Sequence, residues 1–102
     1  MIQYIREQLP QEELLAQLAE EASELSQAAL KLRRVLDGRN PTPVTYDEAI
    51  ENLHEEIADV RLLLELLELT NKFIQTEIMA AKLVRWAKRL EEARQEDAPC
   101  TK

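Results

Sequence analysis

Two short acidic segments hold the residues best suited to chemistry in this chain of 102 residues. Glu21 and Glu24 lie in the segment EASEL, and Glu56 and Asp59 lie in the segment EIADV. In both segments each acid directly precedes an apolar residue, and the two acids stand three positions apart, on one face of a helix. Each pair is therefore expected along the edge of a buried stripe, where two packed helices would bring the pairs together.

The same four acids lack local counter-ions, since no Lys or Arg stands three or four positions away from any of them. Carboxylates beside apolar side chains lose hydration and repel one another, which raises their pKa and costs stability. A hard divalent cation such as Mg²⁺ prefers oxygen ligands and would offset this repulsion. The two segments therefore indicate a metal site, with a solvated or protonated acid cluster as the alternative.

Turn-forming residues divide the chain into four pieces that position these acids. Pro10 follows the first piece, Gly38 closes the second, and the segment 38–45 contains two further prolines and is expected to be a loop. Thr45 is a suitable N-cap for the third piece, and Thr70 and Asn71 offer a cap for the fourth. Apolar residues recur at steps of three and four, as in amphipathic helices. The sequence predicts an all-α fold, with helices over about 11–37, 46–69 and 72–92.

Composition narrows the classes of partner and compartment. The formal charge of −7 disfavours binding to nucleic acid polymers. No window approaches the roughly 18 uninterrupted apolar residues of a membrane span, so no membrane association is expected. The single cysteine, Cys100, suits a reducing cytoplasm. We expect a cytoplasmic protein with one helical domain over 1–94 and a polar C-terminal tail over 95–102.

The C-terminal half of the third piece is apolar on most of its sides, because Leu62, Leu63, Leu66 and Leu69 supplement its regular stripe. A stripe this wide needs neighbours on more than one flank. Three long helices from one chain would hardly surround it. The sequence therefore predicts self-association into a homodimer or homotetramer that completes a bundle of four or more helices.

The acidic pattern resembles the all-α nucleoside triphosphate pyrophosphohydrolases of the MazG-like type. Their signature is E-E-x-x-E followed, after a helix-loop-helix interval, by E-x-x-D. This chain has EEASE and EIAD in that order, and the resemblance covers roughly 12–92. The matching positions are Glu20, Glu21 and Glu24 in the first motif and Glu56 and Asp59 in the second, which Glu55 precedes.

The resemblance implies an antiparallel helical bundle with a four-helix core completed by oligomerisation. It further implies an enzyme that binds Mg²⁺, with Mn²⁺ as a possible substitute, and cleaves a nucleoside triphosphate at the α-phosphorus to the monophosphate and pyrophosphate. The implied metal ligands are Glu21, Glu24, Glu56 and Asp59. The implied catalytic residues Glu20 and Glu55 either orient those ligands or act as the base for the attacking water.

Candidate substrate-binding residues lie on two of the predicted helices. Gln27 and Lys31 continue the Glu24 face by about one and two turns. On the last helix Lys82, Arg85 and Arg89 stand at steps of three and four and form one basic stripe. This stripe suits phosphate binding, with a solvated helix face as the alternative. Similar family members carry Asn where this chain has Trp86, which is a departure from the pattern.

Two other functional classes remain alongside the enzyme. Excess apolar surface suits a non-catalytic helical oligomerisation or interaction protein whose acids only keep it soluble. A nucleotide-binding module that holds metal and triphosphate without turnover would also carry the same acids.

Overall fold

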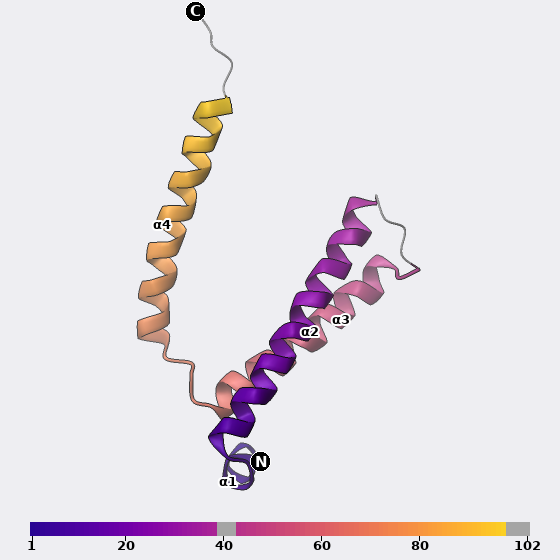
Figure 1. Ribbon diagram of the computed structural model, residues 1–102, viewed down its shortest axis with the longest axis vertical. Coiled ribbons are helices and arrows are strands. Elements are labelled where there is room, and N and C mark those ends of the chain that lie inside the picture. Colours follow the sequence, from indigo (N-terminus) through magenta and orange to yellow (C-terminus); the bar gives the residue numbers. More distant parts are fainter. Residues whose placement is uncertain (39–42, 98–102) are drawn as a thin grey trace, which may run out of the picture. The chain divides into compact units, whose positions relative to one another are not determined.

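The computed structural model describes residues 1–38 and 43–97 and is helical throughout its regular structure (Figure 1). The helices, in chain order, are α1 (Ile2–Gln8), α2 (Gln11–Asp37), α3 (Tyr46–Leu66) and α4 (Lys72–Asp97). No strand occurs in the described residues. The all-α prediction is therefore confirmed. Within the described part of the chain, no helix is long and apolar enough to cross a membrane.

The predicted start and stop signals act at the helix ends. Gly38 ends α2 in the left-handed conformation with φ of 70°, and its N–H donates to the carbonyl of Arg34. The Thr45 hydroxyl accepts from the backbone N–H of Glu48 at 3.2 Å and caps α3. The Asn71 side chain accepts from a backbone N–H at 3.2 Å in the first turn of α4. Part of the predicted loop over 38–45 lies outside the described residues.

Helix α3 ends three residues earlier than its apolar pattern predicts. Glu68 adopts a positive φ of 58°, which a helix interior does not allow. The Leu69 N–H then donates back to the Leu64 carbonyl at 2.9 Å, which is the hydrogen bond of a Schellman cap. The segment 67–69, which the sequence pattern assigns to the helix, therefore forms the cap and the turn that follows α3.

The chain divides into two compact units, 1–69 and 70–102. In the first unit α2 and α3 lie side by side and antiparallel (Figure 1). Their core consists of four leucines at the end of the pair that is nearer α1: Leu14, Leu63, Leu66 and Leu67. Ala28 and Ala49 are the most completely buried residues of the pair, and their small side chains permit the close approach of the backbones. This packing fixes the two acidic segments on adjacent helices.

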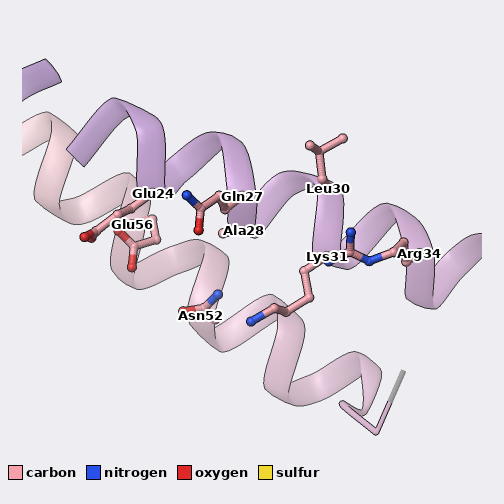
Figure 2. Close-up of a pocket in the computed structure, with 8 residues that line it drawn as sticks. All are labelled: Glu24, Gln27, Ala28, Leu30, Lys31, Arg34, Asn52 and Glu56. Atoms are coloured by element: carbon pink, nitrogen blue, oxygen red, sulfur yellow. The ribbon is translucent and has the colours of Figure 1, made fainter. Parts of the chain in front are cut away.

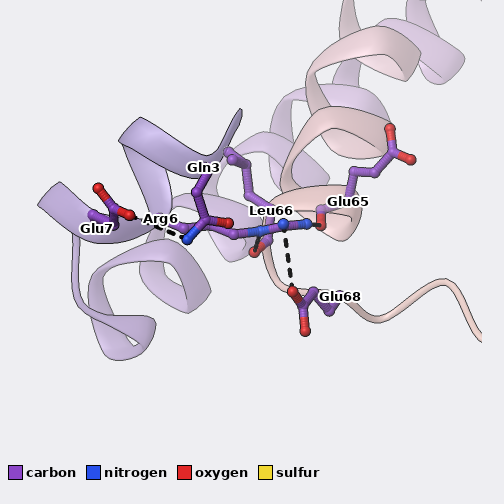
Figure 3. Close-up of polar contacts among 6 residues, drawn as sticks. All are labelled: Gln3, Arg6, Glu7, Glu65, Leu66 and Glu68. Atoms are coloured by element: carbon purple, nitrogen blue, oxygen red, sulfur yellow. Dashed lines mark hydrogen bonds and ion pairs between the residues drawn. The ribbon is translucent and has the colours of Figure 1, made fainter. Parts of the chain in front are cut away.

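Arg6 fastens the short helix α1 to the C-terminal end of α3 (Figure 3). Its Nε donates to the carbonyl of Leu66 at 3.0 Å, and a terminal nitrogen donates to the carbonyl of Glu65 at 2.6 Å. The other terminal nitrogen lies 3.4 Å from a carboxylate oxygen of Glu68. The Glu65 carbonyl also accepts from the backbone N–H of Glu68 at 3.0 Å, and the guanidinium adds a positive charge at the negative end of α3.

The second unit is described over residues 70–97 and consists of helix α4. The helix continues five residues beyond the predicted end at 92, and it passes the predicted domain boundary at 94. No residue of α4 is buried. The single domain over 1–94 stays a prediction, and residues 98–102 of the predicted tail lie outside the described residues.

Candidate metal centre

The two acidic segments face each other across the α2–α3 pair. Glu21 and Glu24 come from the middle of α2, and Glu56 comes from the middle of α3. One carboxylate oxygen from each of the three residues lies within 4.8 Å of the other two. Figure 2 shows Glu24 and Glu56 extending toward each other from the two helices. The convergence of pairs predicted from the sequence is therefore present for three of the four acids.

Two of these carboxylates carry a cost of desolvation. One oxygen each of Glu21 and Glu56 is shielded from solvent and has no hydrogen-bond partner among the described residues. Partial burial, followed by the negative charges of Glu24 and Asp59, raises the pKa of Glu21 from 4.5 to about 7. The same causes in the same order raise the pKa of Glu56. Among the described residues, neither shielded oxygen therefore has a donor that offsets this cost.

The donor set fits a hard divalent cation. Three carboxylates from two helices place oxygen atoms close enough together to coordinate one cation. Oxygen is the donor atom that Mg²⁺ and Mn²⁺ prefer. A cation bound there would offset the repulsion between the carboxylates and would bind the shielded oxygens. Acidic groups also cluster on protein surfaces without a bound metal.

The remaining predicted acids lie at the edge of this centre. Asp59 is exposed and is not one of the three convergent residues, yet its charge contributes to the raised pKa of both Glu21 and Glu56. Glu55 contributes more weakly to that of Glu56. Glu20 is exposed and does not join the convergent group. Their roles in metal binding and catalysis stay predictions.

A pocket of about 400 Å³ adjoins the acids between α2 and α3 (Figure 2). Gln27 and Lys31 line it, as their position on the Glu24 face predicts. Arg34 and Asn52 also line it, and sequence reasoning missed both. Helical spacing could have indicated both residues. Arg34 stands three residues after Lys31 and Asn52 stands four residues before Glu56, so each shares a helix face with a predicted site residue. Acids therefore occupy one end of the pocket and cations the other.

The predicted basic stripe of α4 is a contiguous feature of the second unit. Lys82, Arg85 and Arg89 line a shallow hollow of about 360 Å³ together with Trp86. All four side chains are exposed on this unit. The stripe is thus available for an anionic partner, and the Trp86 indole lies among the cations.

Comparison with protein family models, with curated proteins and with solved structures finds no match for this chain. The functional argument therefore rests on the residues and their arrangement.

Proposed function

We propose that the protein is a Mg²⁺-dependent nucleoside triphosphate pyrophosphohydrolase of the MazG-like type, acting in the cytoplasm. The observation that carries this proposal is the convergence of Glu21, Glu24 and Glu56 from two helices, with shielded carboxylate oxygens that have no partner among the described residues. Gathering carboxylates whose shielded oxygens have no donor costs stability, and a bound cation would offset that cost. The order and spacing of the EEASE and EIAD motifs support the same function.

The protein's own side chains would perform distinct tasks in this reaction. Glu21, Glu24 and Glu56 would hold the cation, with Asp59 as a fourth ligand. When bound, Mg²⁺ supplies a charge that neutralises phosphate oxygens and lowers the pKa of bound water. Glu20 or Glu55 would accept the proton of the attacking water or orient the ligand carboxylates.

Substrate would bind beside the acids in the pocket between α2 and α3. Gln27 and Lys31 provide an amide and an ammonium group there. The α4 stripe of Lys82, Arg85 and Arg89 is a separate candidate for binding phosphate oxygens, on the second unit. A triphosphate carries several negative charges, so an acidic protein can bind it only through cations of this kind.

A second proposal concerns self-association into a homodimer or homotetramer. Four apolar residues of α4 stand at alternating steps of four and three, and each is more than half exposed: Met79, Leu83, Trp86 and Leu90. This 3–4 spacing is the seam along which helices pack in bundles and coiled coils. The same seam supports the competing class of a non-catalytic helical interaction protein. Sedimentation equilibrium distinguishes a monomer from both oligomers.

One assay tests the enzymatic proposal. The purified protein is incubated with a panel of ribo- and deoxyribonucleoside triphosphates and Mg²⁺, and the products are separated by anion exchange. Monophosphate with pyrophosphate is the expected pair of products, and EDTA should abolish their formation. Orthophosphate with diphosphate would indicate a different reaction. Binding without products would leave the nucleotide-binding module as the better description.

A further inference from the structure

The pocket between α2 and α3 is negatively charged at one end and positively charged at the other, and the metal centre involves only the negative end. Glu24 and Glu56 lie at one end, and Lys31 and Arg34 lie at the other. Lys31 stands seven residues after Glu24, which is roughly 10 Å along the helix axis at 1.5 Å per residue. The pocket therefore suits an elongated ligand that needs a metal at one end and fixed positive charge beyond it.

Both cations lean back toward the acidic end. Helical side chains tilt toward the N-terminus of their helix, which for Lys31 and Arg34 is the direction of Glu24. Figure 2 shows this orientation for both residues, and it shows the Lys31 chain crossing from α2 toward α3 on the side of Asn52. Neither cation forms an ion pair with another described residue. Both head groups are thus available to an anion in the pocket.

The pocket lining favours phosphate over a nucleobase at this end. No aromatic side chain is among the described residues that line it, so a base would have no surface on which to stack. Lys and Arg are the usual protein ligands of phosphate, and Arg can bind two phosphate oxygens at once. The Asn52 amide lies between the two ends and can donate to a bridging or non-bridging oxygen.

We propose that Lys31 and Arg34 bind the terminal phosphate of the substrate and thereby make the enzyme prefer nucleoside triphosphates to diphosphates. This inference rests on the proposed function. In either substrate water would attack the α-phosphorus and the α–β bridging bond would break. The leaving group is pyrophosphate from a triphosphate and orthophosphate from a diphosphate. Only the triphosphate has a third phosphate that can reach the two cations.

The test compares kcat/KM for the triphosphate and diphosphate of one nucleoside, the best substrate of the panel. Lys31→Gln and Arg34→Gln are each expected to lower the triphosphate value about tenfold or more, as the loss of a charged hydrogen bond does, with a much smaller effect on the diphosphate. Arg33→Gln is the matched control, because it removes the same charge from α2 at a residue that does not line the pocket. For Arg33→Gln, the ratio of kcat/KM for the triphosphate to kcat/KM for the diphosphate should equal that of the wild type.

A binding measurement keeps the inference separate from the enzymatic proposal. Titration calorimetry with inorganic tripolyphosphate and Mg²⁺ should show about tenfold weaker binding for Lys31→Gln than for Arg33→Gln. If the wild type cleaves no nucleotide, the enzymatic proposal fails and this binding ratio alone decides the inference. Equal losses for triphosphate and diphosphate, or unchanged tripolyphosphate binding, would overturn the role of Lys31 and Arg34.

Discussion

Titration of Glu21 offers a sharp check on the electrostatics of the acidic centre. Partial burial, with the charges of Glu24 and Asp59, raises its pKa from 4.5 to about 7. In metal-free buffer at pH 7 its carboxyl group should therefore be about half protonated, whereas an ordinary exposed glutamate is almost fully ionised. Carbon-detected NMR of the side-chain carboxyl carbons follows this titration directly. Saturating Mg²⁺ should move the midpoint down, because a bound cation favours the ionised form.

The same shift predicts how stability depends on pH. A carboxyl group with a raised pKa binds its proton more tightly in the folded protein than in the unfolded chain. The free energy of unfolding should therefore fall as pH rises from 4.5 to about 7. Above that range the folded protein should bear the full cost of holding Glu21 in its ionised form. Glu21→Gln removes this group, so the variant should have a higher Tm than the wild type at pH 8 in EDTA. The advantage should disappear near pH 4.5.

Thermal denaturation followed by circular dichroism measures this difference. Glu20→Gln is the matched control, since the adjacent side chain is exposed and lies outside the convergent group. Its Tm should follow that of the wild type across the whole range. A Glu21 midpoint near 4.5, with the Glu21→Gln and wild-type Tm curves running parallel, would refute the reasoning.

Four further substitutions test the site and the fold. Glu56→Gln and Asp59→Asn should each abolish Mg²⁺-dependent turnover with unchanged helical content; full turnover in either variant would contradict its assignment as a ligand. Arg6→Met should lower the free energy of unfolding by about 2 kcal/mol, because it removes two charged hydrogen bonds and one exposed ion pair. Urea denaturation measures this loss, and Arg33→Met should change it little. Gly38→Ala should cost about 1 kcal/mol through its left-handed backbone alone, since no atom lies within 4 Å of an added Cβ; an unchanged urea midpoint would argue against that conformation.

Local signals predicted most of the helix boundaries. Gly38, Thr45 and Asn71 act through their own backbone conformation or side-chain oxygen, so each can be recognised from a few neighbouring residues. The end of α3 was harder to predict, because Glu68 adopts a left-handed conformation that Gly usually supplies. The ion pair with Arg6 involves residues far apart in the sequence, and no helical period indicates it.

The acidic centre was predictable to the extent that it depends on helical spacing. Glu21 and Glu24 share a face of α2 for that reason alone, and the missing counter-ions marked them as unusual. Their approach to Glu56 depends on how α2 packs against α3, which the apolar stripes beside both acid pairs indicated and the spacing within one helix could not. Asn52 was missed because an amide one turn before an acid is unremarkable until a pocket forms beside it.

The central claim is that Glu21, Glu24 and Glu56 together hold a divalent cation. Paramagnetic broadening by Mn²⁺ tests it most directly, because the ion broadens the amide resonances nearest its binding site. Substoichiometric Mn²⁺ should broaden the amides of these three residues first, and excess Mg²⁺ should reverse the effect. Broadening that spreads evenly over other acidic positions, such as Glu12 and Glu13 in the first turn of α2, would contradict the claim.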